Sequence, residues 1–296
     1  MENNFCVFIL THGRPDRVHT YDSLMKAGYT GKVFIVIDDE DKTEEEYRKR
    51  FGDKVLQFNK AEWAEKTDEG DNFKHRKAIV YARNACWDLA KKVGCRYFVQ
   101  FDDDYTAFLI RFDSKLKFQT GCMTQNIDAA LTALLDFYKS ISATAIAFSQ
   151  GGDHIGGSGM NKGEGVVGKV KDVTMRRKCM NSWFCDVNKP FKFVGHMNED
   201  VSAYVLNGLK GHLFFTVMQM MLVQKPTQTT AGGMSDLYIE SGTYVKSFYS
   251  VMQSPSCVKI GQLKDPRNPS GCRIHHKINW HNACSKILRS KWRKAR

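Results

Sequence analysis

The stretch Phe98-Val99-Gln100-Phe101-Asp102-Asp103-Asp104-Tyr105 predicts both the fold class and the position of a ligand site. Its first four residues are apolar or β-prone and predict a buried strand, which three carboxylates follow directly. Ligands of open α/β sheets bind outside the carboxyl ends of the strands. Three adjacent carboxylates repel one another, and they are costly beside an apolar strand unless a cation neutralises them. We therefore expect a divalent cation with oxygen ligands here, and a solvated acidic turn is the alternative.

The residues around this stretch alternate between predicted strands and predicted helices. Continuous apolar runs predict buried strands, which indicates a parallel sheet covered by helices. We expect an α/β fold with a mostly parallel, Rossmann-like sheet flanked by helices, followed by a mixed second half. The predicted strands are residues 5–10, 33–37, 55–58, 98–101 and 143–148, and the predicted helices are residues 18–27, 40–50, 75–93, 126–141, 198–210 and 235–250.

The charge of the chain indicates a polyanionic partner. A net charge of +12 and a pI near 9.2 favour nucleic acid, an anionic membrane or phosphorylated ligands. The glycine-dense loop Gly151–Gly168 and the basic segments Lys169–Lys178 and Lys286–Arg296 are where we expect phosphate contacts. A solubilising basic face is the alternative for each segment alone.

The cysteines and the hydropathy pattern predict a cytoplasmic protein. Nine cysteines without a CxxC pair form neither a zinc framework nor a compact disulfide scaffold. Their odd number and the absence of a signal peptide favour a reducing cytosol. The apolar stretch Leu213–Val223 is about half the length of a membrane span. Cys179 and Cys185 lie near His196 in the sequence, but their spacing matches no zinc pattern, so we expect buried thiols.

Polar clusters follow three of the predicted strands, and a fourth lies on the helix before Asp102–Asp104, which we call the acidic stretch. These clusters are Thr11–Arg17, Asp38-Asp39, Asp102–Asp104 and Arg76–Asn84. Capping and turn chemistry would explain any one of them. Four clusters at the same edge of a parallel sheet favour a ligand site.

These residues also carry a family resemblance. The motif T-x-G-R-P-x-R at residues 11–17, the A-R-N helix at residues 82–84 and the DDDY at residues 102–105 resemble GT-A nucleotide-sugar glycosyltransferases. The closer similarity is to the phage TET/JBP-associated branch, which transfers sugars to hydroxymethylated pyrimidines in DNA. The resemblance covers most of the chain and is best over residues 5–110, 194–204 and 272–288. It implies one GT-A-like domain over residues 1–296, with a nucleotide-sugar-binding half (1–125) and an acceptor-binding half (126–296).

The resemblance also implies roles for individual residues on the donor side. Asp102 and Asp104 would hold Mn²⁺ or Mg²⁺, and Asp103 would lie near the ribose. Thr11, Arg14 and Asp39 would line the base and ribose pocket, with Asp38 as a weaker candidate. Arg83 would reach the base or the phosphate, and Arg76 is a further basic candidate. A surface salt bridge is the alternative for Arg83.

Two later motifs resemble the acceptor side of such enzymes. Gly195–Asp200 resembles the acidic motif that supplies the general base, with Asp200 favoured over Glu199. An acidic pair at a helix N-terminus capped by Asn198 is the alternative, and both readings are compatible. His275 or His276, on a predicted strand, would complete the metal site, and strand alternation turns only one of them inward. A structural histidine is the alternative.

The implied activity is metal-dependent transfer of a sugar, from a UDP-linked nucleotide sugar, to 5-hydroxymethylcytosine or 5-hydroxymethyluracil in phage DNA. The compartment would be the host cytoplasm if the chain is viral. Tyr105, Trp183 and Phe184 are candidates either to stack on an extruded base or to fill the core. The alternatives are a glycosyltransferase acting on protein or polysaccharide, and a catalytically inactive DNA-binding protein.

Overall fold

The computed structural model describes residues 1–72, 75–112, 115, 118–150, 173–174, 179, 181–225, 245–264 and 271–287. The predicted phosphate-contact segments Gly151–Gly168, Lys169–Lys178 and Lys286–Arg296 lie largely outside these residues, as does the first part of the predicted helix 235–250. Among the described residues, no helix combines the length and the hydrophobicity needed to cross a bilayer.

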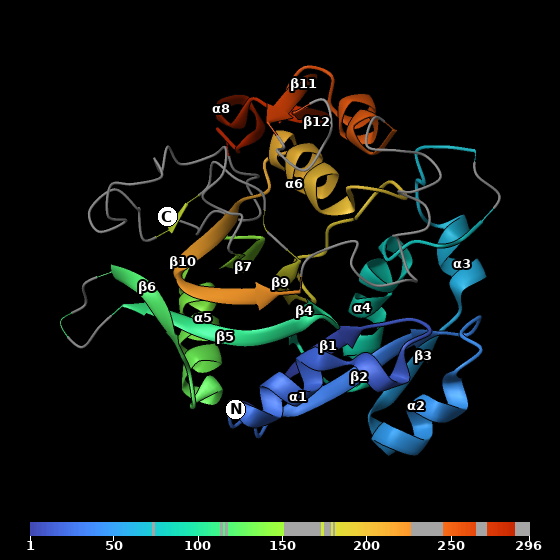
Figure 1. Ribbon diagram of the computed structural model, residues 1–296, viewed down its shortest axis with the longest axis vertical. Coiled ribbons are helices and arrows are strands. Elements are labelled where there is room, and N and C mark those ends of the chain that lie inside the picture. The colour runs from blue at the N-terminus through green and yellow to red at the C-terminus, as the bar shows by residue number, and fades with distance from the viewer. Residues whose placement is uncertain are drawn as a thin grey trace.

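The chain forms a large sheet, a separate hairpin and helices that pack on them (Figure 1). The strands of the large sheet are β1 Phe5–Leu10, β2 Lys32–Asp38, β3 Val55–Phe58, β4 Tyr97–Asp102, β5 Tyr105–Phe112, β6 Phe118–Met123, β7 Ala145–Gln150, β8 Val173–Thr174, β9 Ser182–Asp186 and β10 Phe214–Gln224. The hairpin consists of β11 Val258–Lys264 and β12 Cys272–Ile278. The helices are α1 His19–Lys26, α2 Glu44–Phe51, α3 Lys60–Glu65, α4 Val80–Lys92, α5 Ile127–Ser140, α6 Glu199–Leu209 and α8 Trp280–Ala283, with 3-10 turns at Pro15–Arg17 and Gly52–Lys54 and further helical residues at 245–253.

The α/β prediction is confirmed. Within the described residues the strand order is β3-β2-β1-β4-β9-β7-β10-β5-β6, and β8 pairs with β10. The pairs β3–β2, β2–β1, β1–β4 and β7–β10 are parallel, and the other neighbours are antiparallel. The first half is therefore the predicted parallel unit, and β9 begins the mixed half by inserting between β4 and β7.

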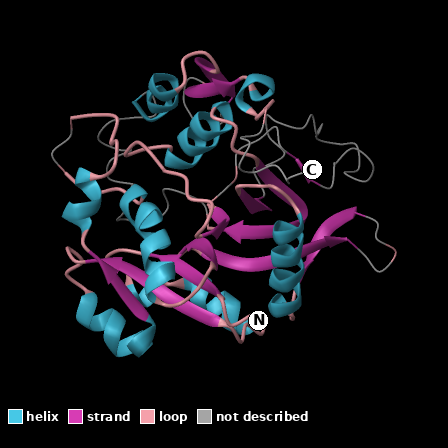
Figure 2. Cartoon of the chain, turned by 180° about the vertical axis from the view of Figure 1, so that it is seen from behind, coloured by secondary structure: helices cyan, strands magenta, loops and turns pink. Residues whose placement is uncertain are grey.

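Both faces of the sheet are covered, and the alternation of β1 shows why this strand is apolar throughout. Phe5, Val7 and Ile9 pack into the core shared with α1, α2 and α5, whereas Cys6 and Phe8 pack into the core shared with α4 and α6. Figure 2 shows these helices from the other side, and the hairpin with α8 lies at the end of the molecule far from α1 and α2. The carboxyl ends of β1, β2 and β4 lie side by side at one edge of the sheet.

Candidate active site

The carboxyl ends of β1, β2 and β4 bring the three predicted polar clusters together. Register places Leu10 beside both Val36 and Asp102, so the residues that follow these strands share one edge. The hydroxyl of Thr11 donates to Oδ2 of Asp103 at 2.6 Å, across 92 residues of sequence. The expected meeting of Thr11 and the acidic stretch therefore takes place in the fold.

Asp103 is the centre of the first group. It is 2% exposed, and its Oδ2 also lies 3.1 Å from Nε of Arg14. Burial raises the pKa of Asp103, while Arg14 and the Thr11 hydroxyl oppose that rise. The phenol of Tyr47 accepts from the backbone N–H of Arg14 at 2.9 Å and lies 2.9 Å from Oγ1 of Thr11. This geometry fixes the loop after β1 and aims it at the acidic stretch.

Asp38 is the centre of a second group at the end of β2. His12 Nδ1 lies 2.8 Å from one carboxylate oxygen, and Lys60 Nζ lies 3.3 Å from the other. Burial alone would raise the pKa of Asp38, but His12 and Lys60 lower it below its ordinary value. Asp39 is exposed and accepts from the backbone N–H of Lys60 at 2.8 Å. Arg76 is also exposed and pairs with Glu40, so Asp39 and Arg76 lie at the rim.

Arg83 joins the acidic stretch to the later acidic motif. Its Nη2 donates to Oδ1 of Asp102 at 2.8 Å, and its Nε donates to Oε1 of Glu199 at 2.9 Å. The side chain is fully buried, which excludes the surface salt bridge considered for it. Although burial opposes a charge, Asp102 and Glu199 raise the pKa of Arg83, so the guanidinium stays protonated. Burial raises the pKa of Asp102 to about 7, against the effect of Arg83.

Asp104 carries the observation that best fits a cation. Its Oδ2 accepts from Nε2 of Gln224 at 3.0 Å, but its buried Oδ1 has no hydrogen-bond partner among the described residues. Burial raises the pKa of Asp104, as it does for the two carboxylates before it. An orphaned carboxylate oxygen in a set of crowded carboxylates is the donor chemistry that Mg²⁺ or Mn²⁺ satisfies.

The acidic motif begins α6, but its asparagine does not cap the helix as expected. Asn198 occupies the N-cap position in the left-handed region (φ 55°) and makes no side-chain cap hydrogen bond. Its Nδ2 instead donates to the carbonyl of Lys246 at 2.6 Å and lies 3.2 Å from Nδ1 of His276. Glu199 and Asp200 are buried in the first turn, and Oδ1 of Asp200 accepts from the N–H of Val201.

The two candidate histidines lie on β12, which pairs with β11 rather than with the large sheet. Their rings are tilted by 32° with centroids 4.1 Å apart, so alternation does not separate them as expected. His276 lies against Asn198, next to Glu199. Among the described residues, neither histidine belongs to a set of three potential metal ligands whose atoms lie within 4.8 Å of one another.

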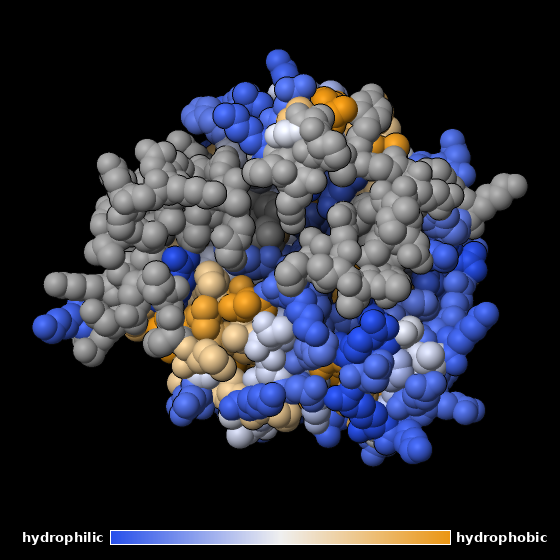
Figure 3. Space-filling model, viewed as in Figure 1, coloured by the Kyte–Doolittle hydropathy of each residue, from blue (hydrophilic) through white to orange (hydrophobic). Residues whose placement is uncertain are grey.

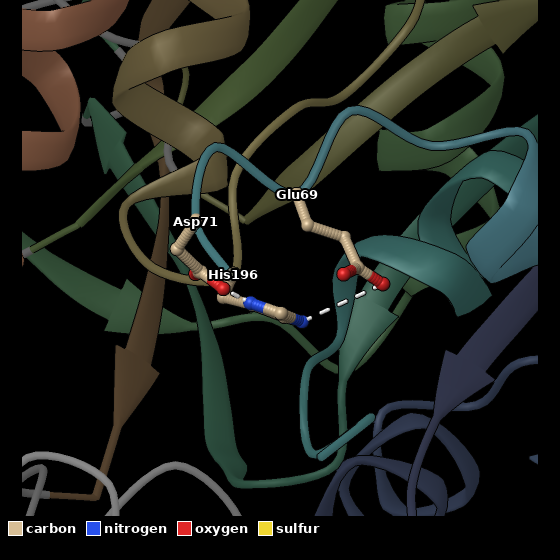
Figure 4. Close-up of side chains that lie close together, drawn as sticks. All are labelled: Glu69, Asp71 and His196. Carbon is tan, nitrogen blue, oxygen red and sulfur yellow. Dashed lines mark hydrogen bonds and ion pairs between the residues drawn. The ribbon is translucent and has the colours of Figure 1, made fainter. Parts of the chain in front are cut away.

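Such a set does occur at Glu69, Asp71 and His196, which sequence reasoning did not combine (Figure 4). His196 is fully buried, with Nδ1 2.6 Å from Asp71 and Nε2 3.7 Å from Glu69. The two carboxylates thus approach opposite ring nitrogens, and an ion bound at one nitrogen would leave the other carboxylate across the ring. The phenol of Tyr81 bridges Nε2 and Glu69 at 2.7 and 2.6 Å, and that of Tyr249 donates to Asp71. The group is a satisfied hydrogen-bond network that ties the acidic motif to α4.

The structure decides the remaining alternatives for aromatic residues and thiols. Tyr105, Trp183 and Phe184 are at most 1% exposed and belong to the core, so they are not available to stack on an extruded base. Cys179 and Cys185 are buried thiols, as predicted.

Sequence reasoning missed Tyr47 and Lys60 because both lie in stretches dominated by charged residues. Tyr47 and Phe51 stand four residues apart in an otherwise charged helix, and both are buried. That i, i+4 apolar pair was the available signal for a helix with one packed face.

The family model of the TET-Associated Glycosyltransferase matches residues 5–233, which include the acidic stretch, Arg83 and the acidic motif but not β11 or β12. No curated protein matches the chain.

Proposed function

The chain belongs to the TET-associated glycosyltransferase family, and we propose that it moves a sugar from a nucleotide sugar, UDP-linked, to the hydroxymethyl group of 5-hydroxymethylcytosine or 5-hydroxymethyluracil in DNA. Family membership makes it a glycosyltransferase. The donor half would be residues 1–125 and the acceptor half residues 126–296. The compartment would be the cytoplasm, that of the host if the chain is viral.

The arrangement of Asp102, Arg83 and Glu199 is the observation that carries the proposal. The buried guanidinium of Arg83 lies 2.8 Å from Asp102, the first residue of the acidic stretch, and 2.9 Å from Glu199 of the acidic motif. A transferase needs its leaving-group site and its base close together, because the acceptor oxygen that the base deprotonates attacks the anomeric carbon that the diphosphate leaves. These two motifs are the expected sources of the two groups.

Donor binding uses the carboxyl edge of the sheet. The orphaned Oδ1 of Asp104 supports Asp102 and Asp104 as ligands of Mn²⁺ or Mg²⁺. Such an ion supplies neutralisation of the charge that develops on the nucleoside diphosphate. Thr11, Arg14 and Asp103 form a buried polar group suited to a ribose, with Asp38 and Asp39 at the adjoining edge. His276, beside Asn198, is the better placed of the two histidines to face this site.

Acceptor activation falls to the acidic motif. The carboxylate of Glu199 is committed to Arg83, which supports Asp200 as the general base. In the proposed step Asp200 accepts the hydroxymethyl proton, the acceptor oxygen bonds to the anomeric carbon, and the bond from that carbon to the diphosphate breaks. Arg83 stays protonated throughout and holds Asp102 and Glu199 in place.

The test begins with melting curves of the protein against a panel of nucleotide sugars, with and without Mn²⁺. A donor that binds the folded state raises the melting temperature with concentration. The shifting donor is then assayed for transfer to duplexes with and without hydroxymethylpyrimidine. Asp104→Asn should abolish the metal-dependent shift and the transfer, while Asp88→Asn, at an exposed site on α4, should leave both intact.

Three outcomes separate this proposal from its rivals. Transfer to a protein or polysaccharide in side-by-side competition, with none to DNA, would support the first rival. Binding of DNA without a donor-dependent shift or any turnover, in wild type and Asp104→Asn alike, would support an inactive DNA-binding protein. A metal-dependent shift followed by transfer only to the modified duplex is the expected result.

A further inference from the structure

We infer that the β11–β12 hairpin is a phosphate-binding ribbon that positions duplex DNA over the acidic motif. This inference rests on the proposed function, because it names the surface that the DNA acceptor would occupy. The hairpin lies outside the residues matched by the family model.

The composition of the hairpin is the first observation. Neither strand contains Asp or Glu, and register places Lys259 directly opposite Lys277. Arg273 lies four residues before Lys277 on the same strand, so alternation places it on the same face. Like charges directly opposite one another destabilise an antiparallel pair. Lys259 and Lys277 are exposed, and neither forms an ion pair with a described residue, so no described carboxylate offsets their repulsion.

The distribution of charge along the chain is the second observation. Residues 1–125 hold 21 acidic and 21 basic side chains, so the net charge of +12 does not come from the donor half. Residues 245–287 hold seven Lys or Arg and a single Asp. Figure 3 shows hydrophilic residues beside a smaller hydrophobic patch at this end of the molecule, where β11, β12 and α8 lie in Figure 1. The excess positive charge among the described residues is thus gathered beside α6.

The attachment of the hairpin to the acidic motif is the third observation. His276 contacts Asn198, the residue before Glu199, at 3.2 Å. Behind the hairpin, the backbone N–H of Asn279 donates to the carbonyl of Cys257 at 2.7 Å, and α8 packs on α6. The contact is so close that a Cβ on Gly208 would lie 2.2 Å from the carbonyl oxygen of Ala283. The lysine pair is therefore held at a fixed place relative to Glu199 and Asp200.

The chemistry of the acceptor fits this placement. The 5-position of a pyrimidine faces the major groove, whose width admits a two-stranded antiparallel ribbon. Lysines on such a ribbon bind backbone phosphates without reading sequence, which suits an enzyme that selects a modified base rather than a site. Lys259 and Lys277 are therefore assigned to the phosphates and the acidic motif to the hydroxymethyl group.

The test compares K259Q/K277Q with wild type and with K49Q/K54Q, which removes the same charge from exposed positions in and after α2, at the far end of the molecule. Affinity for a labelled duplex containing 5-hydroxymethylcytosine is measured by fluorescence anisotropy at several salt concentrations. In K259Q/K277Q the slope of log K against log salt should become shallower by about 1 to 2, since each phosphate contact contributes about 0.9. K49Q/K54Q should keep the wild-type slope, and K259R/K277R should restore it.

The measurements distinguish a failure of this inference from a failure of the proposed function. The donor-dependent melting shift should be the same in K259Q/K277Q as in wild type, which also shows that the variant is folded. Wild-type transfer to DNA together with an unchanged slope in K259Q/K277Q would overturn the ribbon and leave the proposed function standing. Absence of both DNA binding and DNA glycosylation in the wild type would overturn both.

Discussion

Arg83 and Asp102 form a buried ion pair in which Nη2 lies 2.8 Å from Oδ1, although 19 residues separate them in the sequence. The same guanidinium donates to Glu199, which lies 116 residues after Arg83 in the sequence. One side chain from α4 thus connects the end of β4 to the start of α6. The guanidinium carbon of Arg83 also lies over the ring of Phe193, 5.7 Å from its centroid.

Replacing Arg83 by Met should destabilise the fold by about 3–5 kcal/mol, because Asp102 and Glu199 would be left as buried carboxylates without their cation. Urea unfolding at neutral pH measures this loss. The matched control is Arg48→Met, which removes an exposed i, i+4 pair with Glu44 and should cost about 0.5 kcal/mol or less. Equal effects of the two substitutions would contradict the bridging role of Arg83.

The pH dependence of stability should carry a contribution from Asp38. Its pKa in the folded state lies below the ordinary value of 3.8 because His12 and Lys60 outweigh the effect of burial. Folding therefore gains stability from the ionised carboxylate above pH 3.8, and that gain is lost as the pH falls through the lower folded value. The difference in unfolding free energy between wild type and Asp38→Asn should shrink as the pH drops from 5 to about 2.5.

Urea titrations of both proteins across that range make the comparison, and Lys60→Met serves as the control because it removes one cause of the lowered pKa. Lys60→Met should flatten the pH dependence without removing the carboxylate. A difference between wild type and Asp38→Asn that grows on acidification would contradict the assigned direction of the shift.

Local pattern was enough to predict the parallel half of the sheet. Residues 5–10 and 55–58 are strands with the predicted bounds, because a strand buried on both faces is apolar at every position. Local pattern could not predict the insertion of β9 between β4 and β7, since that pairing joins residues about 85 apart and leaves no mark on either strand alone.

The residues of the candidate site were also predictable only in part. The carboxylates of residues 102–104 were predicted because their type and position at a strand end carry the chemistry. The burial of Arg83 was not predictable, since it depends on a carboxylate that α6 supplies. The His196 network escaped notice for the same reason. Its carboxylates lie in an acidic loop before α4 that looks like ordinary surface in the sequence.

The group of Glu69, Asp71 and His196 should hold no metal ion, because its two carboxylates approach opposite nitrogens of one ring. Asp71→Asn should therefore retain the same amount of bound Mn²⁺ or Zn²⁺ per chain as wild type. Elemental analysis after incubation with each metal and desalting, without donor, makes the measurement. Asp104→Asn is the comparison at the proposed metal site. A stoichiometric ion that is lost in Asp71→Asn and kept in Asp104→Asn would show that the network is a metal site.

Gly208 offers a test of how firmly the hairpin region is seated on α6. Alanine in place of glycine inside a helix ordinarily stabilises a protein by about 1 kcal/mol. At this position the added Cβ would lie 2.2 Å from the backbone oxygen of Ala283, so α8 would have to move. Gly208→Ala should instead destabilise by about 1–3 kcal/mol, and Gly208→Val by more. The neighbouring Leu209 is 48% exposed, and Leu209→Ala should change stability by about 0.5 kcal/mol or less. Urea unfolding orders the three variants, and a Gly208→Ala protein more stable than wild type would show that α8 does not pack closely on α6.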